Sequence, residues 1–241
     1  MQTTEIASTV AGSGPSQDDS DTPAMLEAQS LYRFFRVEDD ETLALQGVSL
    51  RIGPGEVVAV AGPSGSGKST LLACLAGLDE PSGGTVHING RRISHQPEQR
   101  RALLRARHIG VLSQSGNLFA HLTVAQNIRL AQSLAGRRPS PNGRDLLESL
   151  GIAGRATALP SQLSGGESAR AGLAVALAND PDVVIADEPT GELDSVNEGR
   201  LLDLLIDRAR TGRAVVIASH SPAVIRRADR VITLLDGRVA S

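Results

Sequence analysis

The sequence predicts an α/β fold with a mostly parallel sheet, a small N-terminal antiparallel β subdomain and an inserted helical subdomain. Two observations support this prediction. First, Asp182–Asp187 and Arg213–Ser219 contain apolar, β-branched runs, which are typical of strands covered on both faces. Second, such runs alternate along the chain with longer segments at helical spacing, as in sheets whose parallel strands are joined by helices.

The chain begins with a segment of different composition. Residues 1–24 are rich in Ser, Thr, Gly, Gln and Asp, so we expect a disordered acidic tail, followed by one folded domain over residues 25–241. Leu31–Val37 and Thr42–Ile52 are then expected to be two strands, joined by an acidic, solvated turn. These strands form the predicted antiparallel subdomain.

The remaining elements follow in order. Besides the two apolar strands above, we expect strands over Val57–Ala61, Thr85–Gly90, His108–Leu112 and Val231–Leu235. The segment from about 116 to 168 has helical spacing and no clear strand, so it is the predicted inserted helical subdomain. A helix of small residues is expected after it, over Ser168–Ala178.

Composition narrows the classes of function. The 241 residues carry a net charge of −3 and only 2% aromatic residues, which argues against a nonspecific nucleic-acid surface. The single cysteine, Cys74, excludes an internal disulfide and is expected to be a small core residue. The chain has no apolar run of about 18 residues and no signal-peptide pattern, so we expect an intracellular protein without a membrane span.

A glycine-rich stretch lies between the strand Val57–Ala61 and a helical run, Leu71–Ala76. It matches the P-loop pattern G-x-x-x-x-G-K-[ST] with Gly62, Pro63, Ser64, Gly65, Ser66, Gly67, Lys68, Ser69 and Thr70. Glycines let such a loop bring backbone N–H groups to phosphate oxygens, at the positive end of the helix that follows. Because strand, spacing, Lys and Ser agree, a nucleoside triphosphate is favoured over a plain surface turn.

Four side chains of this region and of a later strand have expected roles. Lys68 would bind the β- and γ-phosphates, and the Ser69 hydroxyl would ligate Mg²⁺. The apolar run Val183–Ala186 ends in Asp187, which would hold Mg²⁺, and Glu188, which would orient or deprotonate the attacking water. Taken alone, the two acids could as well be surface residues at the end of a strand. The P-loop earlier in the chain favours the catalytic interpretation.

A second glycine pair lies just before the helix of small residues, in the stretch Ser164, Gly165, Gly166 and Glu167. Ser164 and Glu167 have capping-box spacing, so the stretch would serve simply as a helix start. Paired glycines at a helix N-terminus also make an anion site. The stretch is too distant along the chain to be a second complete P-loop of the same site.

Together these motifs resemble the nucleotide-binding subunit of an ABC (ATP-binding cassette) transporter. Leu163–Glu167 resembles the family signature, usually LSGGQ, and Val183–Asp194 resembles the Walker B strand and D-loop. Gln114 matches the Q-loop, and His220 matches the switch histidine. The motifs occur in family order and cover about residues 26–238.

The family also has an aromatic residue that stacks on adenine. Phe35 lies at that place in the sequence, with Tyr32 and Phe34 as competitors. Taken alone, each of the three would be an ordinary strand residue, and only the joint order of the motifs makes Phe35 a site residue.

The resemblance implies an ATP hydrolase with ATP and Mg²⁺ as ligands, in which Gln114 is a further metal ligand and Lys68, Glu188 and His220 are catalytic. It implies a head-to-tail dimer in which Ser164, Gly165, Gly166 and Glu167 bind the ATP of the partner subunit. A homodimer is favoured and a heterodimer stays open. The other implied partner is a membrane permease in a separate chain, with this protein at the cytoplasmic face of the membrane and no nucleic acid.

A finer resemblance is to the lipoprotein-release and macrolide-efflux branch, through Gly62–Leu72, Asn117–Val124 and Asp187–Ser195, although amino-acid importers share much of this pattern. Two positions depart from the family. Glu167 replaces the usual Gln, and Val175 stands where the family usually has Arg. Both departures would weaken closure of the dimer or ATP hydrolysis. Because the three catalytic residues are present, we still expect the dimer to hydrolyse ATP.

Two alternative functions stay open at this point. One is a soluble ABC ATPase of nucleic-acid repair or translation, against which the acidic balance and the single cassette argue. The other is an ATP-gated regulator of a membrane complex without transport. The transported substrate is not encoded in this chain, and export is favoured only by the branch resemblance.

Overall fold

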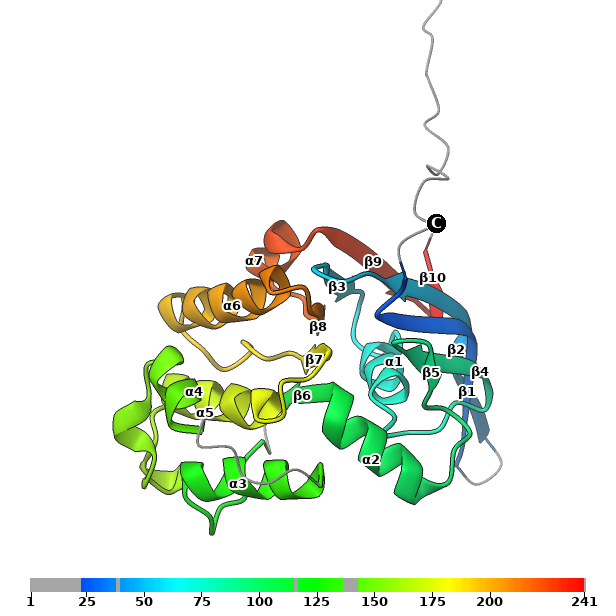
Figure 1. The fold of residues 1–241 in the computed structure, drawn as a ribbon. Helices are drawn as coiled ribbons and strands as arrows, with labels where there is room; N and C mark the ends of the chain where they lie inside the picture. Colours follow the sequence, from blue (N-terminus) through cyan, green and yellow to red (C-terminus); the bar gives the residue numbers. More distant parts are fainter. Residues whose placement is uncertain (1–22, 38–39, 115–116, 137–142, 241) are drawn as a thin grey trace, which may run out of the picture.

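The computed structural model describes residues 23–37, 40–114, 117–136 and 143–240. The predicted tail, up to residue 22, and residue 116 at the predicted start of the helical subdomain lie outside this part. Two sheets and the helices around them make up the described chain (Figure 1).

The larger sheet has six strands in the order β10-β9-β3-β8-β7-β6. They are β3 (Val57–Ala61), β6 (Ile109–Ser113), β7 (Val183–Asp187), β8 (Ala214–Ala218), β9 (Arg230–Leu235) and β10 (Arg238–Val239). All neighbouring pairs are parallel except β9 and β10. The predicted mostly parallel core is therefore confirmed.

The smaller sheet is antiparallel, in the order β2-β1-β4-β5. Its strands are β1 (Leu26–Val37), β2 (Asp40–Ile52), β4 (Gly83–Ile88) and β5 (Arg91–Arg92). β1 begins earlier than predicted, because Leu26 already pairs with Ile52 and Ile88. Near Ser30 (φ 47°) the register between β1 and β2 shifts, which interrupts the regular alternation of side chains along β1.

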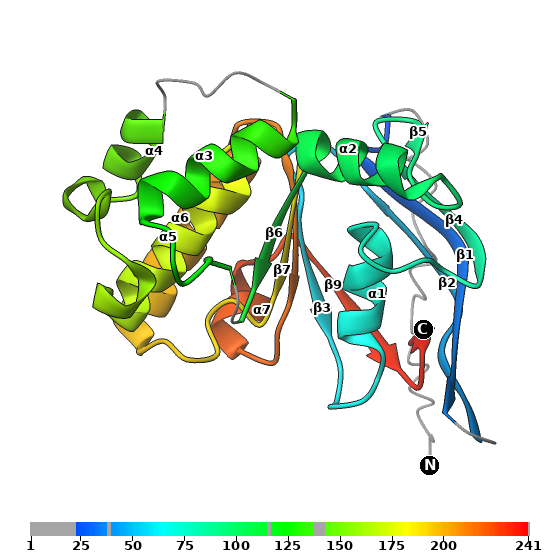
Figure 2. The ribbon, with the colours of Figure 1, turned by 90° about the horizontal axis from the view of Figure 1, so that it is seen from below.

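Side chains of the parallel strands point alternately into two cores. Val183 and Ile185 of β7 join the core shared with α1 (Lys68–Leu75) and the antiparallel sheet, whereas Val184 and Ala186 join the core under α5 (Gly165–Leu177) and α6 (Ser195–Arg210). Figure 2 shows α1 between the two sheets and α5 and α6 across the parallel sheet from it. Burial of each Val or Ile contributes about 1.5–3 kcal/mol, and burial on both faces explains the continuous apolar runs.

Cys74 belongs to the first of these cores. It lies in α1 and is buried. Burial raises the pKa of its thiol to about 12, so the thiolate is absent at neutral pH. The predicted role as a small core residue is confirmed.

The described residues between β6 and β7 form helices joined by turns and loops, with no strand among them. They contain α3 (Val124–Leu134), α4 (Gly143–Ser149), the short turns η1 (Ala153–Arg155) and η2 (Pro160–Gln162), and α5. The polar segment before β6 forms α2 (Glu98–His108), a surface helix that buries no residue. In the described part of the chain, no helix is long and apolar enough to span a membrane.

Two helices were not predicted from the sequence, α6 and α7 (Pro222–Arg227). Asp194 caps α6 by accepting hydrogen bonds from the backbone N–H groups of Val196 and Asn197. Leu201 and Leu205 of α6 are fully buried against the sheet. An aspartate followed by leucines at i, i+4 spacing is a helix signal that is present in the sequence.

Candidate functional site

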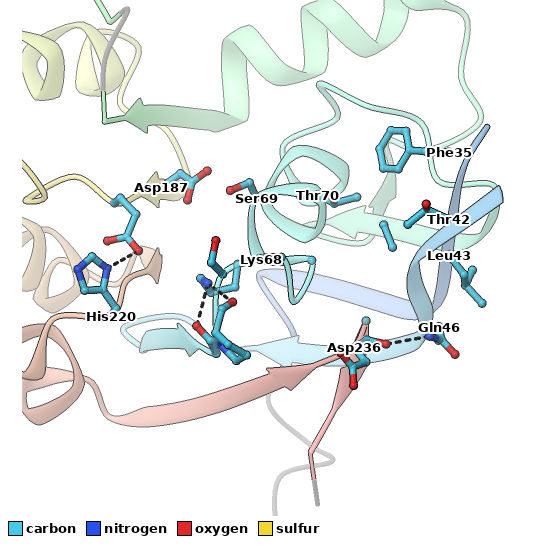
Figure 3. A pocket seen from close by; sticks show the side chains of 18 of the residues that line it. Phe35, Thr42, Leu43, Gln46, Lys68, Ser69, Thr70, Asp187, His220 and Asp236 are labelled. Carbon is cyan, nitrogen blue, oxygen red and sulfur yellow. Dashed lines mark hydrogen bonds and ion pairs between the residues drawn. The ribbon is translucent and has the colours of Figure 1, made fainter. Parts of the chain in front are cut away.

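Most of the predicted site residues lie beyond the carboxyl ends of the parallel strands. Gly62 follows the end of β3, Gln114 the end of β6, Glu188 the end of β7 and Ser219 the end of β8. Because these strands run in the same direction, the segments after them converge, as ligand sites in open α/β sheets do. They line an open cleft of about 860 Å³ together with residues of β1 and β2. Figure 3 shows Asp187 and His220 at one end of this cleft, Phe35 and Thr42 at the other, and Lys68 between them.

The cleft includes residues of every predicted motif except the signature. The predicted site residues that line it are Phe35, Gly62, Pro63, Ser64, Gly65, Gly67, Lys68, Ser69, Thr70, Gln114, Asp187, Glu188 and His220. Within the P-loop, Ser66 does not line the cleft: it is only 2% exposed. Its carbonyl accepts a hydrogen bond from the Gly237 N–H at 3.0 Å, so Ser66 faces the body of the protein.

The P-loop needs glycine where neighbouring strands approach it from below. A Cβ on Gly62 (φ 148°) would lie 2.2 Å from the Leu234 carbonyl oxygen, and one on Gly67 (φ 99°) would lie 2.5 Å from that of Ala44. Both contacts are with backbone atoms of β9 and β2, which cannot move aside. On the other side, a Cβ on Gly65 would meet no atom within 4 Å. The loop is thus fixed from beneath and open toward the cleft.

The ammonium of Lys68 lies over this loop. Its Nζ donates hydrogen bonds to the carbonyl oxygens of Gly62 and Pro63, each at 2.9 Å. Lys68 is also the first residue of α1, so its charge adds to the positive end of the helix dipole. Two of its three N–H groups bind the loop itself. These hydrogen bonds keep a full positive charge at the bottom of the cleft.

The Glu188 carboxylate is held from two directions. The Ser219 hydroxyl donates to Oε2 at 3.0 Å, and His220 Nδ1 lies 2.9 Å from Oε1. Glu188 has a left-handed backbone (φ 45°), and its N–H donates to the Ala218 carbonyl at 2.9 Å. The Glu188 side chain is 21% exposed and the His220 side chain 79%, so the imidazole covers the rim of the cleft. Ser219 was not predicted, although its place before His220 was a usable signal.

Three oxygen-bearing side chains, Ser69, Gln114 and Asp187, line the same cleft. Hydroxyl, amide and carboxylate oxygens suit Mg²⁺, which usually takes one or two carboxylates and completes its shell with water and substrate phosphates. Among the described residues, no group of three or more His, Cys, Asp or Glu side chains could hold a metal ion. The residues therefore fit Mg²⁺ bound together with a nucleotide.

Of the three aromatic competitors, Phe35 lines the cleft, whereas Tyr32 and Phe34 do not. The lining residues that were not predicted are Thr42, Leu43, Ala44, Gln46, Gly191, Asp236 and Gly237. β2 and the β9–β10 turn reach the cleft only through pairing between distant segments, for which a single sequence gives no signal.

The signature stretch forms a helix start, as predicted. The Ser164 hydroxyl accepts from the Glu167 N–H at 3.3 Å, and the Glu167 carboxylate accepts from the Ser164 N–H at 2.9 Å, which completes a capping box. None of the five signature residues, Leu163–Glu167, lines the cleft. Gly165 lines a separate hollow of about 300 Å³, and Gln114 lines both.

The two departures from the family pattern have structural partners. Glu167 accepts from the Ser164 N–H and from Arg155 Nε at 2.8 Å. The hydrogen bonds from Ser164, with the nearby Arg155, lower the pKa of the Glu167 carboxyl from 4.5 to about 2. The negative charge expected at this position is therefore paired within the chain. Val175 is partly buried and packs against the core under α5.

Comparison with known proteins agrees with this arrangement. The ABC transporter family model matches residues 45–191. An uncharacterized ABC transporter ATP-binding protein of Mycobacterium tuberculosis is 42% identical over 219 residues, covering 89% of this chain and 88% of that protein. The lipoprotein-releasing system ATP-binding protein LolD of Rhodospirillum rubrum is 40% identical over 222 residues, covering 90% of this chain and 98% of that protein.

A longer relative is the macrolide export ATP-binding/permease protein MacB of Hyphomonas neptunium, 40% identical over 225 residues. The match covers 91% of this chain but only 35% of MacB. Among solved structures, a dimeric ATP-binding cassette in a post-hydrolysis state with ADP and Pi superposes with a TM-score of 0.83 at 32% identity, covering 90% of this chain and 97% of that one. The chain belongs to the ABC transporter family of ATP-binding proteins.

Proposed function

We propose that this chain is the ATP-binding and ATP-hydrolysing subunit of an ABC transporter. The observation that supports this most is the cleft itself, where Lys68 and the P-loop face Asp187, Glu188 and His220. These are the groups that a triphosphate, a metal ion and an attacking water require. ATP would bind with its base toward Phe35 and its γ-phosphate between Lys68 and Glu188.

Each residue has a role in this proposal. Glu188 accepts the proton of the attacking water while the bond from the γ-phosphorus to ADP breaks, and inorganic phosphate and ADP result. Ser219 and His220 keep the Glu188 carboxylate in place, and Lys68 neutralises charge on the phosphate oxygens. Ser69, Asp187 and Gln114 would hold Mg²⁺, which neutralises phosphate charge when it is bound.

The proposed working unit is a head-to-tail dimer. The Ser164–Glu167 stretch offers the N–H groups of a helix start yet lies outside the cleft of its own chain. A second subunit, turned around, would supply this stretch to the open side of the cleft. The dimeric ATP-binding cassettes among the structural relatives support this proposal.

The proposed second partner is a membrane permease in a separate chain. The LolD relative is named as part of a lipoprotein-releasing system, and the MacB relative as an ATP-binding/permease protein. We therefore assign this chain to an export or lipoprotein-release system, with a peripheral position on the cytoplasmic face of the membrane. The exposed segment with Phe119, whose side chain is 63% exposed, is the proposed contact with the permease.

Light scattering tests the dimer. The Glu188→Gln protein, with ATP and Mg²⁺, is expected to have twice the monomer mass, and to return to the monomer mass with ADP. Lys68→Ala is the control and is expected to stay monomeric in both. If Glu188→Gln stays monomeric with ATP at a concentration where it binds ATP, the dimer proposal is wrong.

Capture from detergent-solubilised membranes tests the partner. ATP-loaded Glu188→Gln protein is the bait and Lys68→Ala protein the control. Recovery of a multispanning permease only with the first bait would support the proposal, and movement of substrate across vesicles would then separate a transporter from a regulator without transport. Recovery of nucleic acid instead would favour a repair or translation ATPase.

A further inference from the structure

We propose that Arg33 is a positioning residue for the nucleotide base, acting through Phe35. The inference rests on the proposed function, because it assumes that the cleft binds an adenine nucleotide. The Arg33 guanidinium carbon lies over the Phe35 ring, 4.6 Å from the ring centroid. This distance is within the range of a cation–π interaction.

The two residues have different relations to the cleft. Phe35 lines it, and Arg33 does not. The guanidinium therefore covers one face of the ring, and ring surface on the cleft side stays open to a ligand. A base that binds there stacks on a ring already supported from behind, which gives the order guanidinium, phenyl ring, base.

Arg33 is itself fixed in place. Its Nε donates to Asp79 Oδ2 at 2.7 Å and its Nη2 donates to Asp79 Oδ1 at 2.8 Å, which makes a bidentate ion pair. Both side chains are partly buried, at 24% and 30% exposure. Such a planar pairing holds the guanidinium at one angle, which a lysine ammonium would not do.

Asp79 ties this pair to the phosphate site. Its backbone N–H donates to the carbonyl of Ala73 in α1 at 3.1 Å, and α1 begins at Lys68. The chain of contacts thus runs from the helix that starts at the P-loop, through Asp79 and Arg33, to the ring of Phe35. The base platform has a fixed position relative to the phosphate loop.

Two physical effects follow. The ring of Phe35 is held before the base arrives, so less side-chain freedom is lost on binding. The positive charge behind the ring also draws its electron density away from the open face, which reduces repulsion with the π-face of the base. Both effects act on the base and neither acts on the phosphates.

Calorimetric titration of the full chain with Mg²⁺–ADP and with Mg²⁺–pyrophosphate tests the inference. Pyrophosphate carries the phosphates without the base. We expect Arg33→Met to raise the Kd for ADP about three- to fivefold and to leave the Kd for pyrophosphate unchanged. In a Phe35→Leu background, the same substitution is expected to have no effect on the Kd for ADP.

A purely structural role would raise both dissociation constants, or would persist in the Phe35→Leu background, and either result would overturn the inference. Arg33→Lys keeps a charge beside Asp79 without the planar fork, and is expected to give a smaller, ADP-selective loss; it serves if Arg33→Met does not fold. If the wild-type chain binds pyrophosphate and ADP equally well, the inference is wrong while the phosphate site stands. If it binds neither, the proposed function is wrong as well.

Discussion

His220 Nδ1 lies 2.9 Å from Glu188 Oε1, although the two residues are 32 positions apart in the chain. The contact joins the residues that follow two neighbouring parallel strands, β7 and β8. Glu188 reaches it from a left-handed backbone (φ 45°), a conformation that costs a non-glycine residue about 1–2 kcal/mol. The hydrogen bond from the Glu188 N–H to Ala218 offsets part of this cost. Strain of this kind at a cleft is a reason to assign function to the residue.

Replacement of Glu188 by Gln tests its role as the base. The amide has nearly the same shape but cannot take up a proton, so we expect kcat to fall by about 10²–10⁴-fold with an unchanged Kd for ATP. Phosphate release in the presence of the captured permease measures turnover, and calorimetry measures binding. Wild-type turnover in this variant would remove Glu188 from its role.

Replacement of His220 by Ala tests the contact at the rim. Since the imidazole holds one oxygen of the Glu188 carboxylate, we expect kcat to fall at least about tenfold with little change in KM. Ser219→Ala removes the contact with the other oxygen, and is expected to lower kcat in the same way. An unchanged kcat in both variants would show that Glu188 needs neither neighbour.

Replacement of Lys68 by Ala tests the charge over the P-loop. Loss of a charge-assisted contact to phosphate costs about 1.5–3 kcal/mol, so we expect the Kd for ATP to rise about 10- to 100-fold. Arg92→Ala removes an exposed cation outside the cleft and is the matched control. Equal losses in the two variants would mean that net charge, and not Lys68 itself, determines binding.

Two glycine-to-alanine substitutions test how closely helix α5 packs on strand β6. A Cβ on Gly110 of β6 would lie 2.5 Å from the carbonyl oxygen of Ala176, so we expect Gly110→Ala to lower the free energy of unfolding by about 1–3 kcal/mol. A Cβ on Gly199 of α6 would meet no atom within 4 Å, so Gly199→Ala is expected to raise it by about 0.5–1 kcal/mol. Urea unfolding measures both, and a loss in both variants would contradict the packing argument.

The acid dependence of stability tests the Glu167 contacts. The pKa of this carboxyl is about 2 in the folded chain, below its ordinary value of 4.5. Ionised Glu167 therefore stabilises the fold fully above about pH 4.5, and this stabilisation is lost as the pH falls toward about 2. We expect the stability difference between the wild-type chain and Glu167→Gln to shrink over this range in urea titrations. A difference independent of pH would mean that the charge of Glu167 does not stabilise the fold. Arg155→Gln is expected to reduce the difference above about pH 4.5, where Glu167 is ionised.

Several features of this protein could be predicted from short stretches of sequence. The P-loop residues, the capping box at Ser164, and the buried strands of the parallel sheet are each specified by neighbours within a few positions, through backbone freedom, hydrogen bonding and two-sided burial. Helix α6 also has a local signal, Asp194 followed by the spacing of Leu201 and Leu205, although it was not predicted.

The α/β class, the phosphate loop and the order of the motifs depend on short-range patterns, and the sequence alone is enough to predict them. Packing of the folded chain places Phe35, and not Tyr32 or Phe34, at the cleft, with Arg33 behind its ring. The same packing leaves the Ser164 stretch outside the cleft of its own chain. These positions follow from strand pairing, because pairing, with the register irregularities in β1, fixes which side chains converge. Pairing between segments far apart in the chain leaves no signal in either segment alone.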